Sequence, residues 1–302
     1  MQTWFKQLSF YILGKDGTPT AEAIAAKLAE AEFAHCLGLD WFTEGFATPV
    51  PFDAALVFTT NGHAHRIALK KEEKVLPNAV IKEALDEKIM LIEQEEARKV
   101  GRKEKMDLKD RITDDMLPRA FTKSARIEAI FDTKRGYFLV NSATTSKAEG
   151  MLSKTRQALW GLEAKLPNTE LSPRTLMTNW LLAGEAAGRF QLDSDCVQQG
   201  TGETSPVIRM AKMDLIEEEV VNHVKNGKIV TELGLIWDER LRFILTQDLA
   251  LKRIQYLDVL QDEASEHGDD MASLITASQI IMVEALGALL DELIGHLGGL
   301  QK

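Results

Sequence analysis

The chain has 302 residues, of which 45% are hydrophobic, and its formal net charge at pH 7 is −10. This length can bury a sizeable core, in two domains or in one domain with an appended lobe. The only cysteines, Cys36 and Cys196, are too few for a disulfide framework and indicate free thiols in a reducing compartment. We expect no signal peptide, because the first residues have the pattern of a strand, and no membrane span, because acidic residues interrupt the most apolar stretch.

The N-terminal part alternates predicted strands with a single helix. The expected elements are a strand over 3–13, a turn at Asp16-Gly17, a helix over 21–33 capped by Thr20, an irregular stretch over 37–52, and strands over 54–60 and 63–69. Asn61-Gly62 joins the last two strands, and this dipeptide is the strongest short signal for a hairpin.

A charge-dense stretch follows, and it predicts one long helix. The helix begins near Pro77, because proline is tolerated only in the first turn, and it ends by Leu117, because Pro118 disfavours helical geometry in the residue before it. An apolar stripe opens the helix and then fades, leaving a helix that is polar on all sides; the stripe comprises Ile81, Leu85, Ile89 and Ile92. Such a helix projects into solvent or bridges to another domain or molecule.

Positive charge is concentrated in this region. Residues 97–126 contain ten basic and five acidic residues, a local net charge of +5, which leaves −15 for the rest of the chain. On a helical period one side of the helix carries Arg98, Arg102, Lys105 and Lys109. Such a stripe suits DNA phosphates, which would give salt-sensitive binding without sequence preference. The pattern alone favours the alternative, a solvated helix whose charges pair at i,i+4 with neighbouring glutamates and aspartates.

A second hairpin is predicted over 119–131 and 137–141, followed by a helix over 146–162. Alternation along its first strand places Arg119, Phe121 and Lys123 on one face. A large aromatic side chain between two cations is unlike a core position. Three roles are open for Phe121: stacking on a base, packing against another subunit, or plain packing within the chain.

The C-terminal half is similarly mixed. The expected elements are helices over 175–182 (opened by Ser172-Pro173), 217–225 (ended by Asn226-Gly227) and 271–297, strands over 190–198, 206–212, 228–237, 240–246 and 251–256, and a solvated acidic linker over 258–270. Hairpins alternating with single helices indicate an α+β fold with antiparallel sheets and flanking helices. We divide the chain into an N-terminal part (1–76), a projecting charged helical arm (77–118), a hairpin and helix that complete the N-terminal part (119–166), and a C-terminal part (167–302).

No catalytic or cofactor motif stands out. His63 and His65 lie two apart on a predicted strand, but a surface pair explains them better than a metal site, because no further ligand accompanies them. Gly200-Thr201-Gly202 lacks the lysine and hydroxyl residue that a P-loop requires. We therefore expect no enzyme, no cofactor and no metal.

Several long strings resemble the RdgC family of bacterial recombination-associated proteins. They are TWFKQLSFYIL near the start, KKEEKVLPNAVIKEALDEKI, MLPRAF after the charged helix, and VIRMAKMDL followed by EEEVVNHVKNGKIVTEL. The similarity extends from the first strand to GGL near the C-terminus.

This resemblance implies a cytoplasmic, nucleoid-associated protein without catalytic activity. Members of the family form a head-to-head, tail-to-tail homodimer, closed into a ring whose positive hole admits duplex DNA, and they are thought to limit the access of RecA to DNA in recombination and replication-fork repair. Single-stranded DNA is a further ligand to consider, and no membrane is involved.

The resemblance also implies roles for individual residues. Phe121 matches the gate contact between subunits, with Arg119 beside it, Arg98 matches a basic residue of the projecting helices, and Lys212 and Lys228 match DNA-facing lysines. Without the resemblance, both lysines would be ordinary exposed residues. The sequence departs from the family at Ala211, where a further lysine is expected, and at Gly101 within the basic helix.

Two alternatives to a DNA-encircling ring stay open. The acidic surface or the charged arm could dock directly on a recombinase, with DNA binding secondary. An enzyme that acts on DNA would instead show metal-dependent turnover. The apolar helix over 271–297 could supply part of the second self-contact that a ring needs.

Overall fold

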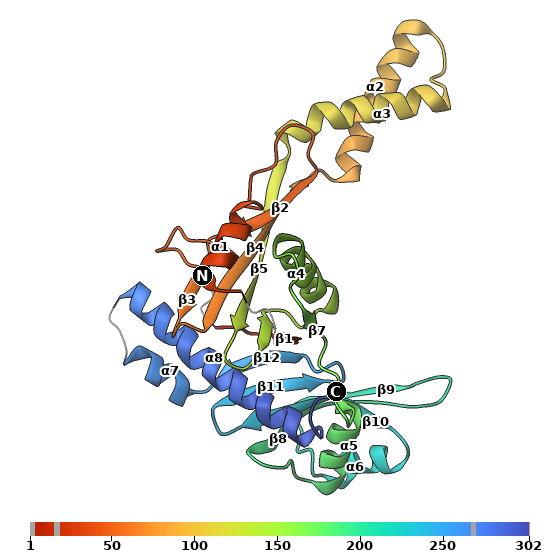
Figure 1. Ribbon diagram of the computed structural model, residues 1–302. Coiled ribbons are helices and arrows are strands. Elements are labelled where there is room, and N and C mark those ends of the chain that lie inside the picture. The colour runs from red at the N-terminus through yellow and green to blue at the C-terminus, as the bar shows by residue number, and fades with distance from the viewer. Residues whose placement is uncertain (1–3, 15–18, 267–269, 302) are drawn as a thin grey trace. The chain divides into compact units, whose positions relative to one another are not determined.

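The computed structural model describes residues 4–14, 19–266 and 270–301 (Figure 1). Helices combine with antiparallel sheets, as predicted. The chain forms two compact units: the first unit comprises 1–28, 48–67 and 127–302, and the second unit comprises 29–47 and 68–126. The turn predicted at Asp16-Gly17 lies outside the described residues.

One sheet of the first unit has the strand order β3–β4–β5–β6–β1–β7. Its strands are β1 (Ser9–Leu13), β3 (Phe58–Thr60), β6 (Tyr137–Val140), β7 (Ala164–Lys165), the first residues of β4 (Ala64–Val75) and the last of β5 (Phe121–Asp132). Both predicted hairpins are formed, β3 with β4 and β5 with β6. Asn61 and Gly62 have φ values of 52° and 69°, which is the left-handed geometry that an Asn-Gly hairpin turn requires.

Two helices accompany this sheet. They are α1 (Ala21–Ala29) and α4 (Thr145–Ala158). The Thr20 hydroxyl accepts a 3.3 Å hydrogen bond from the amide of Ala23, so the predicted start of α1 is confirmed, although the helix ends four residues earlier than predicted. The first strand is also shorter than predicted, since β1 begins at Ser9.

The second sheet of the first unit follows the sequence closely, and all of its predicted strands are present. Its order is β12–β11–β10–β8–β9, with β8 (Phe190–Gln199), β9 (Val207–Met210), β10 (Ile229–Trp237), β11 (Leu241–Thr246) and β12 (Leu251–Tyr256). The predicted helices are α5 (Pro173–Ala183), α6 (Glu218–Lys225) and α8 (Met271–His296). Asp238 and Glu239 both have positive φ at the centre of the three-residue β10–β11 connection, where the amide of Arg240 donates a 2.9 Å hydrogen bond to the carbonyl of Trp237.

The long helix α8 is a core helix of the first unit. Leu286, Leu289, Leu290 and Leu293 are fully buried in the same apolar cluster as strands of the second sheet. The helix is long and apolar enough to cross a membrane, but 61% of its most apolar 18-residue window is buried inside the structure. Its apolar stripe therefore packs into the core of the first unit.

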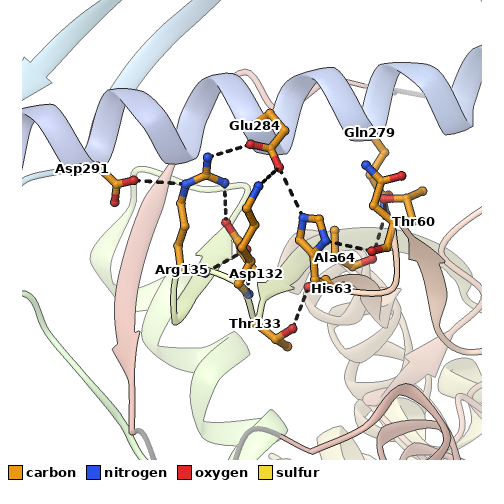
Figure 2. A network of polar contacts seen from close by, with 11 residues as sticks. Thr60, His63, Ala64, Asp132, Thr133, Arg135, Gln279, Glu284 and Asp291 are labelled. Atoms are coloured by element: carbon orange, nitrogen blue, oxygen red, sulfur yellow. Dashed lines mark hydrogen bonds and ion pairs between the residues drawn. The ribbon is translucent and has the colours of Figure 1, made fainter.

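A polar network attaches α8 to the turn between β5 and β6 (Figure 2). Arg135 donates hydrogen bonds to Glu284 and Asp291 on α8, at 2.7 and 3.1 Å, and to Asp132 at 3.3 Å. Gly287 on α8 makes room for this arginine, because a Cβ there would lie only 2.6 Å from Arg135 Cδ. The network thus links the sheet that contains β1 to the helix that covers the second sheet.

The second unit contains the charged segment, and the single long helix predicted for it is wrong. The segment forms α2 (Asn78–Glu96), α3 (Arg102–Met116) and the 3₁₀ turn η1 (Leu117–Arg119). Ala97 adopts left-handed geometry with φ of 51° and ends α2, and Gly101 is the N-cap of α3. The amide of Val100 donates a 3.0 Å hydrogen bond to Glu93, which holds the two helices together at the connection.

Two further predictions are corrected. The stretch over 37–52, predicted to be irregular, contains β2 (Phe42–Ala47), which pairs with β4 in the second unit. The acidic stretch after β12 is not a linker, because α7 (Asp258–Ser265) forms there and buries Leu260 and Ala264. Glycine and proline residues led to the irregular prediction over 37–52, and acidic residues obscured the apolar positions of α7.

Candidate nucleic-acid interface

The break between α2 and α3 rearranges the predicted basic stripe. Arg98 lies in the connection, where its guanidinium donates two 2.7 Å hydrogen bonds to Glu104 and one of 2.6 Å to Glu96. These hydrogen bonds, those to Glu104 first, raise the pKa of Arg98. The prediction of a continuous basic stripe from Arg98 to Lys109 is therefore wrong. For Arg98 the alternative holds: its charge is paired with glutamates, on both sides of the connection between the two helices.

Three other predicted DNA-binding residues of the second unit are exposed cations. Arg102 and Lys105 are three residues apart on α3 and share a face, and Arg119 lies in η1. Within the described residues none of the three forms an ion pair. Their positive charge is available to a polyanion, whereas that of Arg98 is already compensated.

Phe121, the first residue of β5, is 87% exposed. Arg119 and Lys123 beside it are exposed as well. Plain packing within the chain does not explain this side chain, because almost none of it is covered. Stacking on a ligand and packing against another subunit stay open.

An apolar surface lies in the same unit, and we call it the apolar rim. It consists of Leu37, Leu39, Trp41 and Phe42, which are 73%, 56%, 47% and 58% exposed. The ammonium group of Lys74 donates 2.9 Å hydrogen bonds to the carbonyls of Gly38 and Leu117. This lysine therefore brings the segment of the rim next to the turn that leads into Phe121.

A buried carboxylate fixes the same segment. Glu72 is 4% exposed; it accepts a 3.0 Å hydrogen bond from the amide of Cys36 and lies 2.9 Å from His35 Nδ1. Ser124 on β5 donates to it at 3.4 Å. These contacts, the Cys36 amide first, lower the pKa of Glu72. The apolar rim is thus held in place before any partner binds.

In the first unit, Lys212 lies beside the middle of β8 and Lys228 lies beside its end. Lys212 follows β9, and the next residue donates its amide to Ser194 at 3.1 Å. Lys228 precedes Ile229, which pairs with Gln199 at the end of β8. The five steps from Ser194 to Gln199 correspond to about 17 Å along the strand.

A further cation lies between them. Arg209 on β9 pairs with Val197 in the middle of this interval, and its side chain is exposed. Sequence reasoning missed it. No sequence signal marked it, because Val207-Ile208-Arg209-Met210 shows no polar–apolar alternation and the exposure of Arg209 is seen only in the structure. The backbone positions of the three cations thus follow β8 from its middle to its end, two on the β9 side and one on the β10 side, and we call them the row of cations.

The histidine pair is not the surface pair that was expected. His63 lies in the turn before β4, whereas His65 lies within β4, is 4% exposed, and shares a 2.9 Å hydrogen bond with the Thr59 hydroxyl. Burial lowers the pKa of His65. Across the described ranges, no group of three or more His, Cys, Asp or Glu side chains is arranged to hold a metal ion.

Comparison with known proteins gives the family. The family model described as "Putative exonuclease, RdgC" matches residues 3–300. This chain belongs to the RdgC family. It is 60% identical over 298 residues to the recombination-associated protein RdgC of Neisseria meningitidis serogroup C (strain 053442), covering 99% of both chains. The protein of the same name from Laribacter hongkongensis (strain HLHK9) is 44% identical over 296 residues, with 98% of both chains covered, and that of Pseudomonas syringae pv. syringae (strain B728a) is 36% identical over 299 residues, with 98% of this chain and 97% of the relative covered. The resemblance seen in the sequence is confirmed.

Proposed function

We propose that this RdgC-family chain binds DNA without sequence preference, encircles duplex DNA as a homodimeric ring in the nucleoid, and limits the access of RecA during recombination and replication-fork repair. The relatives share the name recombination-associated protein, and this name supports a role in recombination. The residues of the candidate interface support the mode of binding, because exposed lysines and arginines contact phosphates, which carry no sequence information.

The exposure of Phe121 carries the proposal. A two-fold dimer contact is self-complementary, so the same surface must hold both the knob and its receptor. The second unit has both, with Phe121 as the knob and the apolar rim as the receptor. Each Phe121 packs on the partner's rim, and this is one of the two self-contacts that a closed ring needs.

The row formed by Lys212, Arg209 and Lys228 supplies phosphate contacts from the first unit. Its length of about 17 Å spans several phosphates of one strand. A two-fold dimer doubles the row. Because each neutralised phosphate releases counterions, binding falls steeply as salt rises.

Gel shifts on two duplexes of unrelated sequence, each at about 50 and 200 mM salt, test this function. We expect equal affinities for both duplexes and a loss of about 10³-fold or more at the higher salt. Binding that is insensitive to salt, or selective for one duplex, would contradict the proposal.

We further propose that the chain acts without catalysis, although the family model's description names an exonuclease. End-labelled duplex incubated with the protein and magnesium should stay intact at protein concentrations that saturate binding. Shortened products that disappear on adding a chelator would establish an enzyme instead.

Direct docking on a recombinase is the second candidate. The charge of −15 outside residues 97–126 favours it, because an acidic surface attracts basic proteins. The two candidates differ in whether inhibition survives the loss of DNA binding.

A further inference from the structure

Trp160 is the most exposed large apolar side chain among the described residues. It follows the C-terminal end of α4 in the first unit, and 91% of it is exposed, compared with 87% for Phe121. The proposed dimer contact and the row of cations beside β8 do not use it. A partner that covered the indole would gain the free energy of burying a large aromatic surface.

The turn imposes this exposure. Leu159 and Leu162, on either side of the tryptophan, are 5% and 9% exposed and anchor the turn in the core. The amide of Leu162 donates to the carbonyl of Leu159 at 3.1 Å, and the guanidinium of Arg156 donates to the carbonyl of Ala164 across the turn. Trp160 is therefore presented on a braced turn, and a ligand would have to immobilise little more than the indole itself.

The surroundings are basic, in contrast to the chain as a whole. Residues 145–166 contain four basic residues and two acidic ones, a net charge of +2 in a chain of −10. Arg156 contacts the carbonyl of Ala164, and exposed Lys165 is the next residue, so both cations belong to the turn that carries Trp160. Lys165 makes no ion pair with any other described residue.

These charges decide between two kinds of partner. In a two-fold contact with a second copy, the patch would face itself and would bring Arg156 and Lys165 towards their own copies. Phe121 also lies between cations, but its unit offers the apolar rim as a receptor for its aromatic ring. A polyanion has the opposite charge. Among polyanions, a nucleic acid also offers flat apolar faces, and an aromatic ring stacks on unpaired bases while nearby cations follow the phosphates. Bases within a duplex are already stacked on each other, so the ligand is a single strand.

We propose that Trp160 stacks on an unpaired base of single-stranded DNA, with Arg156 and Lys165 beside the adjoining phosphates. This inference rests on the proposed DNA-binding function and deepens it. It gives the protein a contact to single strands that is separate from the phosphate contacts to duplex DNA.

Fluorescence anisotropy tests the inference, with a labelled 30-nucleotide oligo-dT and a labelled 30-base-pair duplex as probes. The variants are Trp160→Ala, Trp160→Phe and, as a matched control, Leu166→Ala, which removes another exposed apolar side chain (62% exposed) from the same segment. We expect Trp160→Ala to weaken oligo-dT binding by about 5- to 100-fold, Trp160→Phe to retain most of the affinity, and Leu166→Ala to change little. Duplex affinity should stay the same in all three.

Trp160 also provides a direct signal. The difference in emission between the wild type and Trp160→Phe isolates this tryptophan, and oligo-dT should quench it. Unchanged oligo-dT affinity in Trp160→Ala would overturn the inference, and so would a Trp160→Ala variant that dissociates into monomers, since that result assigns the residue to a protein contact. If the wild type bound neither probe, the proposed function itself would fail, so the two failures are distinguishable.

Discussion

The carboxylate of Glu284 on α8 accepts a 2.7 Å hydrogen bond from Arg135 and one of 2.9 Å from Lys134 (Figure 2). These contacts, the Arg135 hydrogen bond first, lower the pKa of Glu284 from 4.5 to about 2. Because the pKa is lowered in the folded state, the ionised carboxylate stabilises the fold above pH 4.5, and this stabilisation is lost as the pH falls from 4.5 towards 2.

We therefore predict that Glu284→Gln destabilises the first unit by about 1 kcal/mol at pH 7, a value discounted for the partial exposure of the pair. The variant should also lose less stability than the wild type between pH 5 and pH 3. Urea unfolding at each pH, followed through the buried Trp180 and Trp237, measures both effects. Glu203→Gln, a change on an exposed turn, is the control and should follow the wild type. Parallel pH curves for Glu284→Gln and the wild type would contradict the prediction.

Phe121→Ala should open the contact at the apolar rim. A buried aromatic anchor at an interface is worth about 2 kcal/mol or more, which corresponds to a loss of about 30-fold or more in the association constant of that contact. Sedimentation alone can miss this loss, because in the proposed ring a second contact would hold the dimer together.

The measurement is a disulfide across the contact, between cysteines introduced at Leu39 and Lys123. The background carries Cys36→Ser, which removes the only cysteine near the rim and keeps the backbone amide that Glu72 binds. Crosslinking should fall sharply when Phe121→Ala is added and should stay unchanged with Val259→Ala, a substitution at an exposed apolar residue of the first unit. Equal crosslinking with and without Phe121 would contradict the proposed contact between Phe121 and the apolar rim of the partner subunit.

Most elements could be predicted from the sequence, because local signals agreed with the fold. Asn61-Gly62 favoured a left-handed turn, and the alternation on either side of Asp238-Glu239 marked the next turn. The Ser172 hydroxyl caps α5 by accepting a hydrogen bond from the amide of Thr175, as its position implied. The break after α2 was not predicted, because glycine is tolerated within helices and only the left-handed geometry of Ala97 and the side-chain contacts of Arg98 reveal the turn.

The candidate site was predictable only in part. The family resemblance pointed to Phe121 and the two lysines, but no pattern in the sequence could show that Lys74 brings the apolar rim next to η1. Arg209 and Trp160 were missed for a similar reason. Their importance lies in exposure, which depends on how distant segments pack.

The different surroundings of the basic residues in the second unit predict different salt dependences. Replacing a residue that neutralises one phosphate reduces the slope of log affinity against log salt by about 0.9 in each subunit, so by about twice that value in a homodimer. We expect that reduction for Arg102→Ala and for Lys105→Ala, which lack acidic partners among the described residues. Arg98→Ala should change the slope less, because Glu96 and Glu104 already compensate its charge.

Duplex binding by each variant at four or five salt concentrations gives these slopes. Hydrogen exchange provides an independent readout for Arg98, since Arg98→Ala should speed exchange at the connection between α2 and α3, whereas Lys105→Ala should not. A slope that falls as much for Arg98→Ala as for Lys105→Ala would show that Arg98 leaves its glutamates to contact DNA.

The double variant Lys212→Ala/Lys228→Ala decides whether inhibition of RecA acts through DNA. Both side chains lie at the surface of the first unit, and their loss removes two phosphate contacts from each subunit, so duplex affinity at about 100 mM salt should fall at least tenfold. If the ring works by covering DNA, inhibition of RecA-dependent strand exchange should fall in proportion. Lys27→Ala/Lys225→Ala removes the same charge from exposed helix surfaces of the first unit and is the matched control. Strand exchange that stays fully inhibited by a double variant without measurable DNA binding would favour direct docking on the recombinase, because only a protein contact could then carry the inhibition.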